Sequence, residues 1–300
     1  MNSLPGIQLE HGHVLNPWQA VHNNIRGTQF LLENSIEWRV KNFVLVSTDK
    51  SVKPTNVMGA SKRVCELLLQ SHLGDGTALM AVRFGNVVGS SGSVLPLFRE
   101  QIECGGPITV THPDVTRYFM TIPEASQLIL QAGGLGKGGE VFILKMGTPV
   151  RIADMARDLI RLSGKEPDRD IKIEYTGLRP GEKLYEELIT YGEGIVPTEH
   201  EKIMVLKADG KWNGNGNQKA FRKWLNNHIK ELYHLADLHR AEDIREKLQC
   251  LVPEYQVQHH SCVLDVPRGE PTNLRVIRSI QNKEKFEHSI NSDKAAFSTI

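Results

Sequence analysis

The run NFVLVS, residues 42–47, constrains the fold more than any other feature of the sequence. It is continuously apolar, short and followed at once by the polar residues TDK, which is typical of a parallel strand buried on both faces. Leu79 to Phe84 has the same character, and a further strand is predicted at 140–144. Apolar residues at helical spacing precede and separate the first two runs, at 16–35 and 57–73. Strands that alternate with helices predict an α/β fold built on a parallel sheet.

The rest of the chain divides by its texture. Shorter elements are predicted as helices near 95–103 and at 123–132, 151–163 and 183–189, and as strands near 108–110, 117–121 and 171–175. The sequence NGNGN from residue 213 breaks this alternation, and 218–249 carries many charges at helical periodicity, which indicates one or two solvated helices. After Pro253 the periodicity fails, and we expect a weakly ordered tail.

Composition excludes several classes of function. The 300 residues include 36 Lys and Arg against 35 Asp and Glu, a net charge of +1, so no global field favours nucleic acid or an anionic membrane surface. The apolar runs are far shorter than the ~20 residues that cross a bilayer. The first residues show neither the basic nor the apolar region of a secretory signal. We therefore expect a cytoplasmic protein with no nucleic-acid partner and no membrane span.

Two patterns that resemble ligand motifs predict none. Cys250, His259, His260 and Cys262 could be drawn as a zinc site, but their spacing fits none of the usual structural patterns, so no metal is predicted. The four cysteines of the chain include no CxxC pair, which favours reduced thiols. Gly134–Gly139 satisfies G-x-G-x-x-G, yet it follows a helix and precedes a strand, the reverse of the dinucleotide-binding order, and predicts a turn.

Polar groups follow the first apolar run directly and mark a candidate site. Thr48, Asp49 and Lys50 place a hydroxyl, a carboxylate and an ammonium at the carboxyl edge of a parallel sheet, where open α/β folds bind ligands. On these residues alone, a capped loop with a solvated Asp–Lys pair is an equal interpretation. The next helix favours a site, because Met58 and Lys62 are spaced i,i+4 and so lie on one helix face.

A Gly-rich loop and two arginines in separate segments are further candidates for ligand binding. The second apolar run continues as RFGNVVG, residues 83–89, and such a loop offers backbone N–H groups to phosphate oxygens, with a merely flexible loop as the alternative. Arg117 and Arg179 add guanidinium groups, whose fork binds diphosphate oxygens bidentately. Isolated arginines are usually solvated, so Arg117 and Arg179 are candidates only because of the segments in which they lie.

The combined pattern STDK-x-x-x-P-x-N-x-M-G-x-[ST]-K-R resembles the extended short-chain dehydrogenase/reductases of bacterial surface-polysaccharide synthesis, in particular the CapD-like nucleoside-diphosphate-sugar 4,6-dehydratases. The resemblance runs from about residue 14 to about residue 206. Most relatives in the wider superfamily use Tyr-x-x-x-Lys, whereas here Met58 stands at the Tyr position and Lys62 keeps its place. A thioether cannot exchange a proton, but the Met form is typical of the larger, membrane-anchored dehydratases of this group.

The resemblance implies NAD-dependent 4,6-dehydration of a UDP-N-acetylhexosamine in capsule or O-antigen synthesis. NAD takes hydride from sugar C4, water is lost across C5 and C6, and the hydride returns to C6. Lys50 and Asp49 match the base and acid of the elimination, Thr48 the hydrogen bond to the C4 oxygen, and Lys62 the contact to the nicotinamide ribose. With Met58 in the tyrosine position, the acceptor of the C4 hydroxyl proton stays open.

The resemblance also implies binding residues and partners. Ser47, Arg83 and Gly85 are expected to join Lys62 at the cofactor. The expected contacts to the sugar nucleotide are Asn86, Ser93, Val94, Pro96, Thr109, Arg117, Arg179 and Glu182. The expected partners are the substrate and either a second copy of the chain or a separate N-terminal half.

A full-length member of this family begins with a strand, a Gly-x-x-Gly-x-x-Gly turn and a helix, for which the residues before His13 leave no room. We therefore expect a truncated or split form that alone binds NAD poorly and lacks dehydratase activity. Its expected fold is a partial NAD(P)-binding Rossmann sheet without its first strands and with an exposed edge, a small α+β substrate-binding part and a helical or disordered C-terminal tail. The predicted parts are 1–150 for the Rossmann part with interleaved substrate loops, 151–212 for the substrate-binding part, 213–256 for a helical extension and 257–300 for a disordered tail.

Two other functions stay open. A nucleotide-sugar 4-epimerase of the same superfamily would match the fold, but Asp49, Lys50 and Met58 suit elimination and lack the tyrosine that epimerases use. A non-catalytic remnant that binds a nucleotide sugar or a partner subunit is the third interpretation, and occupancy by a cofactor would distinguish it.

Overall fold

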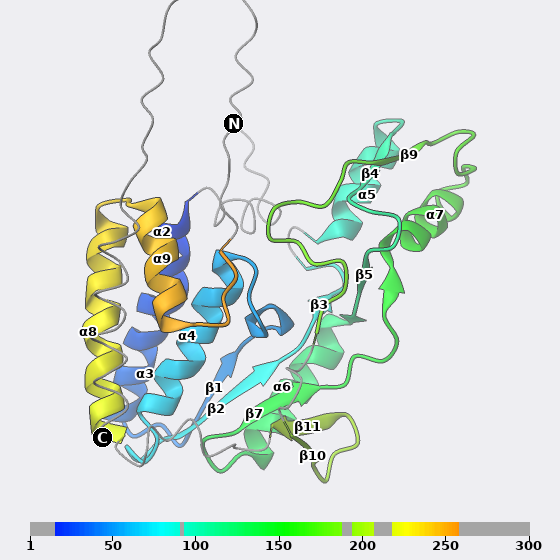
Figure 1. Ribbon diagram of the computed structural model, residues 1–300. Coiled ribbons are helices and arrows are strands. Elements are labelled where there is room, and N and C mark those ends of the chain that lie inside the picture. Colours follow the sequence, from blue (N-terminus) through cyan, green and yellow to red (C-terminus); the bar gives the residue numbers. More distant parts are fainter. Residues whose placement is uncertain (1–15, 91–92, 188–193, 207–217, 258–300) are drawn as a thin grey trace, which may run out of the picture. The chain divides into compact units, whose positions relative to one another are not determined.

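The computed structural model describes residues 16–90, 93–187, 194–206 and 218–257 (Figure 1). A five-stranded sheet in the order β1-β2-β7-β11-β10 lies at the centre. Its first three strands, β1 (Asn42–Val46), β2 (Ala78–Arg83) and β7 (Val141–Leu144), run parallel, which confirms the strands predicted from the apolar runs. The last two strands, β11 (Ile203–Leu206) and β10 (Ile195–Pro197), are antiparallel additions that the sequence did not indicate.

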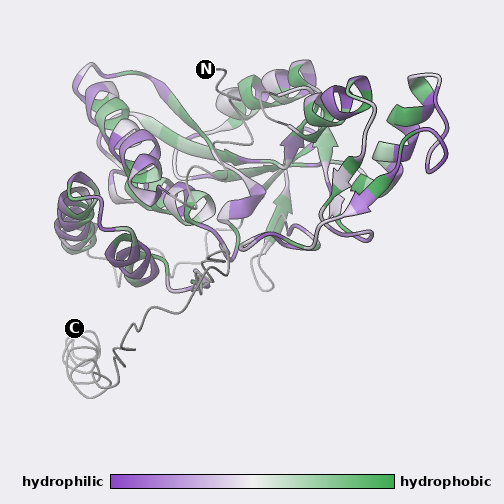
Figure 2. Ribbon diagram, turned by 90° about the horizontal axis from the view of Figure 1, so that it is seen from above, coloured by the Kyte–Doolittle hydropathy of each residue, from purple (hydrophilic) through white to green (hydrophobic). Residues whose placement is uncertain are grey.

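Helices cover both faces of this sheet because successive residues of its strands point in opposite directions. Leu79 and Ala81 of β2 belong to a core cluster with α4 (Val57–Ser71), whereas Met80 and Val82 belong to one with α6 (Ile122–Leu135). Figure 2 shows hydrophobic residues along the central strands and mixed character on the surrounding helices. The continuous apolar runs of the sequence therefore report burial on two faces.

The cluster around α4 is built from both ends of the described chain. The helix predicted at 16–35 is present as α2 (Pro17–Ala20), a π-helical turn η1 (Val21–Arg26) and α3 (Gly27–Glu37). The charged segment from 218, predicted as one or two helices, forms two, α8 (Gln218–Asp237) and α9 (Ala241–Leu251). Their apolar stripes pack into the same cluster, so each of these helices is solvated on one side only.

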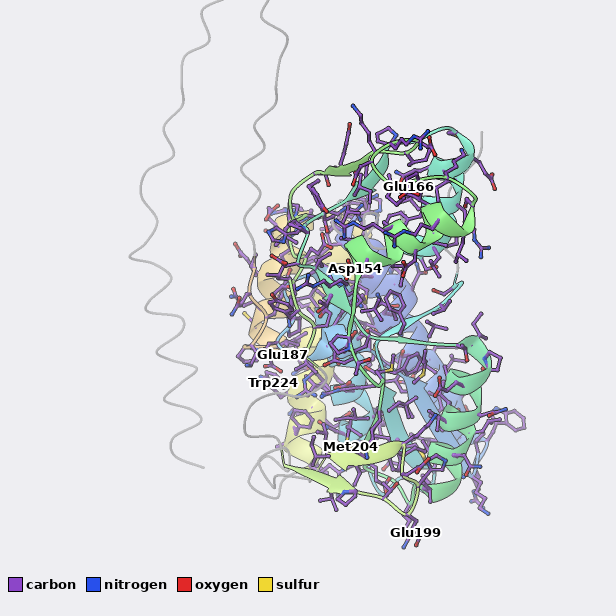
Figure 3. The ribbon with its side chains drawn as sticks, turned by 90° about the vertical axis from the view of Figure 1, so that its right-hand side faces the viewer. Asp154, Glu166, Glu187, Glu199, Met204 and Trp224 are labelled. Atoms are coloured by element: carbon purple, nitrogen blue, oxygen red, sulfur yellow. The ribbon has the colours of Figure 1, made fainter. Side chains whose placement is uncertain are left out.

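A third core cluster lies beyond the carboxyl ends of the parallel strands. It joins α5 (Val94–Glu103) and β4 (Ile108–Val110) to α7 (Ile152–Leu162), and β4 pairs with β9 (Ile173–Tyr175). Asp154 and Glu166 mark this end of the molecule in Figure 3, and Glu199, in the turn between β10 and β11, lies at the opposite end. The predicted boundary at residue 150 therefore passes through a core shared by 94–115 and 152–173.

Short strand pairs connect this third cluster to the sheet. β3 (Asn86–Val87) pairs with β6 (Phe119–Met120), and β5 (Thr116–Arg117) pairs with β8 (Val150–Arg151). The single strand predicted at 117–121 is thus two short strands with different partners.

The helix predicted at 183–189 is wrong over its described part, because 183–187 is irregular and 188–189 lies outside the described residues. Its polar groups bond to distant segments instead of to one another. The Leu184 carbonyl accepts from the Thr116 backbone N–H at 3.1 Å, and Lys183 Nζ donates to the Val52 carbonyl at 2.9 Å. The predicted tail beyond 257 also lies outside the described residues. Across the part of the chain that the structure describes, no helix combines the length and apolarity of a membrane span.

Candidate active site

The loop that follows β1 folds into a single turn of 3-10 helix, η2 (Asp49–Ser51). The Thr48 hydroxyl caps this turn, and the Asp49 backbone N–H donates to the Phe84 carbonyl at 3.1 Å, just beyond the end of β2. The ends of two adjacent parallel strands are thereby held together. This is the sheet edge at which the sequence predicts a ligand site.

The Lys50 ammonium lies at the centre of a small polar cluster. Its Nζ atom is 3.2 Å from Asp49 Oδ1 and 3.0 Å from Asn86 Oδ1, and the Thr48 hydroxyl donates to the same Asp49 oxygen at 2.9 Å. The Asp49 side chain is 1 % exposed and that of Lys50 is 13 % exposed. The other carboxylate oxygen, Asp49 Oδ2, is buried and has no hydrogen-bond partner within the described ranges. A carboxylate and an ammonium are therefore in contact at this sheet edge, with little exposure to solvent.

Helix α4 approaches this cluster very closely. Asn56 caps the helix as predicted, with Oδ1 accepting from the Gly59 N–H at 2.9 Å. A Cβ atom at Gly59 would lie 2.0 Å from the Lys50 carbonyl oxygen, so only glycine permits this approach. One turn along the helix, Lys62 Nζ donates to the Val46 carbonyl at 3.2 Å, and Met58 is half-buried in the first turn.

Ser47 and Arg83 flank the cluster but bind a buried carboxylate, that of Glu66. Glu66 Oε1 accepts from the Ser47 hydroxyl at 2.7 Å and from Arg83 Nε at 2.8 Å. Glu66 Oε2 accepts from Arg83 and from Arg63, both at 2.7 Å. Burial alone would raise the pKa of Glu66, but the Arg83 and Arg63 guanidiniums outweigh it and hold that pKa well below its usual range. Ser47 and Arg83 therefore belong to a buried network around Glu66, beside the Lys50 cluster.

A segment far along the chain, 178–187, closes over the cluster. Gly181 has a φ of +77°, and a Cβ atom there would lie 2.8 Å from the Thr55 carbonyl, so a glycine is required where this segment meets the loop before α4. The Thr55 hydroxyl donates to the Gly181 carbonyl at 2.8 Å. This contact joins the loop of the candidate site to the segment that holds Arg179 and Glu182.

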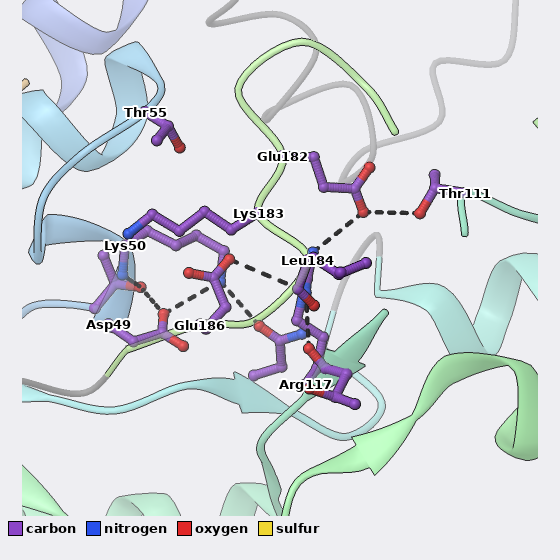
Figure 4. A network of polar contacts seen from close by, with 12 residues as sticks. Asp49, Lys50, Thr55, Thr111, Arg117, Glu182, Lys183, Leu184 and Glu186 are labelled. Atoms are coloured by element: carbon purple, nitrogen blue, oxygen red, sulfur yellow. Dashed lines mark hydrogen bonds and ion pairs between the residues drawn. The ribbon is translucent and has the colours of Figure 1, made fainter. Parts of the chain in front are cut away.

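Arg117 is held by carboxylates of the same segment (Figure 4). Its side chain is 9 % exposed, and NH2 donates to Glu182 Oε1 at 3.1 Å. Glu182 Oε1 also accepts from the Thr111 hydroxyl at 3.0 Å, and the Glu182 Oε2 atom accepts from the Arg179 backbone N–H at 3.2 Å. Two predicted substrate contacts, Arg117 and Glu182, are thus adjacent.

Glu186 links Arg117 to the Lys50 cluster, and no pattern in the sequence points to it. Its Oε1 atom lies 3.9 Å from Arg117 Nε, its side chain is 5 % exposed, and Oε2 is buried with no hydrogen-bond partner in the described part of the chain. Burial raises the pKa of the Glu186 carboxyl, Lys50 opposes this rise, and Asp49 adds to it. Sequence alone does not separate Glu186 from the adjacent Glu187, which is exposed and pairs with Lys53.

The other predicted contacts lie at the edges of the site or outside it. Gly85 packs against Asp49, since a Cβ atom there would lie 3.1 Å from Asp49 Oδ2. Ser93, Val94 and Pro96 are at the start of α5, where Ser93 is the N-cap residue and Pro96 is exposed. The Thr109 hydroxyl accepts from the Gln101 amide at 2.8 Å, and Arg179 is exposed.

Comparison with known protein families finds a match that covers most of the described core. The family model described as "Polysaccharide biosynthesis protein" matches residues 13–208. Those residues contain the whole cluster from Thr48 to Glu186, whereas α8 and α9 lie outside the match.

Individual relatives share the same region. The chain is 58 % identical over 205 residues to "Capsular polysaccharide biosynthesis protein CapD" of Staphylococcus aureus, which covers 66 % of this chain and 34 % of that protein. It is 54 % identical over 200 residues to "Probable polysaccharide biosynthesis protein EpsC" of Bacillus subtilis (strain 168), covering 66 % and 33 %. "UDP-glucose 4-epimerase" of Rickettsia canadensis (strain McKiel) is 37 % identical over 178 residues, covering 58 % and 51 %. The chain thus spans about a third of the length of the first two relatives.

Among solved structures, the chain is similar to the X-ray structure of Pen from Bacillus thuringiensis. The TM-score is 0.60 at 36 % sequence identity, and the match covers 70 % of this chain and 64 % of that one. The predicted α/β Rossmann-type fold is confirmed by this similarity together with the parallel sheet.

Proposed function

The chain belongs to the polysaccharide biosynthesis protein family, and we propose that it carries the elimination and sugar-nucleotide sites of an NAD-dependent 4,6-dehydratase acting on a UDP-N-acetylhexosamine. The observation that carries the proposal is the contact of Lys50 with both Asp49 and Asn86 at the carboxyl ends of β1 and β2. It supplies a base and an acid at the edge of a parallel sheet where α/β folds bind ligands.

The elimination needs two proton transfers on neighbouring sugar carbons. In the free site the pair is an ammonium and a carboxylate, so a proton first passes from Lys50 Nζ to Asp49 Oδ1, 3.2 Å away. The Lys50 amine then removes the proton at C5, and Asp49 donates its proton to the C6 hydroxyl, which leaves as water. Thr48 holds the C4 oxygen through its hydroxyl, which in the free site donates to Asp49. Because Asp49 is almost fully buried, bulk water is kept away from the pair during these transfers.

NAD, when bound, accepts hydride from C4 and returns it to C6. Lys62 fits the nicotinamide ribose, because its ammonium lies at the carboxyl end of β1 beside the Val46 carbonyl and on the helix face of Met58. Among the expected cofactor contacts, we propose that of Lys62 alone as direct. Ser47 and Arg83, which bond to Glu66, act indirectly by fixing the ends of β1 and β2.

Arg117 binds the diphosphate of the sugar nucleotide, and Glu182 binds a ribose hydroxyl. Arg117 suits this role because its guanidinium is buried and is fixed by backbone carbonyls of Thr116 and Leu184 at 2.7 and 3.3 Å. Glu182 lies in segment 178–187, whose Gly181 and Lys183 bond to Thr55 and Val52 in the loop between β1 and α4, so diphosphate and sugar lie within reach of one site.

A chimera tests the proposal directly. Residues 13–208 of this chain replace the matching segment of the Staphylococcus aureus relative, and the chimera is incubated with UDP-N-acetylglucosamine. A product lighter than the substrate by one water, with a 4-keto group, supports the dehydratase. A folded chimera that returns only unchanged sugar nucleotide contradicts it.

A 4-epimerase is the second candidate, favoured by the similarity to "UDP-glucose 4-epimerase" of Rickettsia canadensis (strain McKiel). Epimerisation keeps the mass of the substrate and inverts C4, so the same assay distinguishes the two reactions. The Asp49–Lys50 pair argues against it, because an adjacent acid and base serve an elimination across C5 and C6 that epimerisation at C4 does not include.

A further inference from the structure

The charged side chains that lie between the Lys50 cluster and Arg117 include equal numbers of cationic and acidic groups. Lys50, Arg117 and Lys183 are cationic, and they face Asp49, Glu182 and Glu186. These residues come from the loop after β1, from β5 and from segment 178–187. A sugar nucleotide brings two further negative charges to Arg117, so its binding leaves a cluster of excess negative charge in a buried place.

The three carboxylates differ in how well they are stabilised as anions. Glu182 accepts from Arg117, from the Thr111 hydroxyl and from a backbone N–H. Asp49 accepts from Lys50 and from the Thr48 hydroxyl. Glu186 has only a long contact of 3.9 Å to Arg117 Nε, and its Oε2 atom is enclosed without a partner among the described residues. Glu186 is therefore the carboxylate that an added negative charge neutralises first.

Glu186 also occupies a position beside Arg117 that is suited to an anion. Its carboxylate lies between the Asp49–Lys50 pair and Arg117, the guanidinium assigned to the diphosphate (Figure 4). A diphosphate oxygen at Arg117 Nε would replace or oppose this carboxylate. Protonation removes the repulsion and turns Glu186 into a hydrogen-bond donor toward the ligand.

We propose that Glu186 is a positioning residue of the sugar-nucleotide site that couples binding to protonation: it holds the anion position beside Arg117 in the free protein and takes up one proton when a diphosphate binds there. The inference rests on the proposed function, because it takes the diphosphate to bind at Arg117. The proton comes from solvent and stays on the Glu186 carboxyl while the ligand is bound. A neutral ligand does not drive this proton uptake, whereas a dianionic diphosphate does.

Calorimetry of UDP-N-acetylglucosamine binding to the whole chain measures the proton directly. Each phosphate of a sugar nucleotide carries one ester bond and shares the anhydride bond, so its remaining acidic oxygen stays ionised near neutral pH, and proton uptake reports the protein. At pH 7, in two buffers of different ionisation enthalpy, the apparent binding enthalpy of the wild type is expected to depend on the buffer. Its affinity is expected to strengthen as the pH falls from 8 to 6, by up to about tenfold per pH unit, the limit for one proton.

Glu186→Gln and Glu187→Gln form a matched pair, because the two residues are adjacent and only Glu186 is buried. Glu186→Gln is expected to abolish the buffer and pH dependence and to bind more tightly than the wild type at pH 8. Glu187→Gln is expected to keep wild-type behaviour.

The outcomes separate the inference from the function on which it rests. Absence of binding by the wild type contradicts both the sugar-nucleotide site and the inference. Binding with no proton uptake contradicts the inference alone, a result that does not depend on whether either variant folds. Uptake that persists in folded Glu186→Gln also overturns it, because the proton then belongs to another group such as Asp49.

Discussion

The Lys50 ammonium lies 3.0 Å from Asn86 Oδ1, which joins the turn after β1 to β3, the short strand that follows β2. The same ammonium contacts Asp49, so the two residues proposed for the elimination are oriented by a third from the neighbouring strand. The amide oxygen has no proton to lose, and it therefore fixes Lys50 without competing in proton transfer.

Lys50→Ala or Asp49→Asn in the chimera is expected to lower kcat by ~10²-fold or more, the usual scale for a general acid or base. Lys41→Ala serves as the control, because Lys41 is exposed and precedes β1. Steady-state formation of the 4-keto product is the measurement. Wild-type turnover in both variants would remove these residues from the reaction.

Arg117→Ala is expected to weaken UDP-N-acetylglucosamine binding by ~1.5–3 kcal/mol, the range for hydrogen bonds to charged groups. Arg117→Lys should restore only part of the affinity, since it lacks the bidentate fork. Arg179→Ala should also weaken binding, whereas Arg157→Ala, on the exposed side of α7, should not. Calorimetry that finds equal affinity for Arg117→Ala and the wild type would exclude Arg117 as a diphosphate contact.

Glu66→Gln is expected to destabilise the fold by ~3–5 kcal/mol at pH 7, because Arg63 and Arg83 lose a buried charged partner. The pKa of Glu66 is depressed in the folded state, so its stabilisation is present above its unfolded pKa of ~4.3 and is lost as the pH falls below that value. Urea unfolding should therefore show a difference in the free energy of unfolding between wild type and variant, and this difference should narrow below about pH 4. The exposed control Glu103→Gln should match the wild type at every pH.

Gly59→Ala is expected to cost at least ~1–3 kcal/mol, because the new methyl group would overlap the Lys50 carbonyl and displace η2. Gly27→Ala is the control. Gly27 begins α3, and a methyl group there would meet only the His22 carbonyl oxygen, at 3.8 Å, so alanine should be neutral or stabilising by up to ~1 kcal/mol. Equal urea midpoints for the two variants would contradict the close approach of α4 to the loop.

Leu232→Ala is expected to destabilise the protein by ~2–5 kcal/mol, since Leu232 of α8 is fully buried in the cluster around α4. Leu238→Ala, at a side chain that is 55 % exposed, should change stability little. The comparison shows whether α8, which lies outside the family match, is part of the cooperative fold. Similar thermal midpoints for both variants would mean that α8 unfolds separately.

The sequence by itself predicted the parallel strands, α4 with its Asn56 cap, and the grouping of Thr48, Asp49 and Lys50 at the end of β1. These features follow from local rules, because apolar periodicity and capping act over a few residues. The end of β1 and the start of α4 are joined by a short loop, so they lie close together wherever the rest of the chain packs. For the same reason, α8 and α9 were visible as helices, but not their burial against α4.

Only the tertiary structure decided which charged groups meet. Glu66 pairs with Arg83 of another element, and Glu186 reaches Arg117 and Lys50 from segments far away in sequence. Other long-range hydrogen bonds take the place of the helix predicted at 183–189. The Leu184 carbonyl accepts from the Thr116 backbone N–H, and the Lys183 ammonium donates to the Val52 carbonyl. Glu186 and Glu187 are the same residue type at neighbouring positions, and they differ in burial. Burial depends on how distant segments pack, so the local sequence could not distinguish the two.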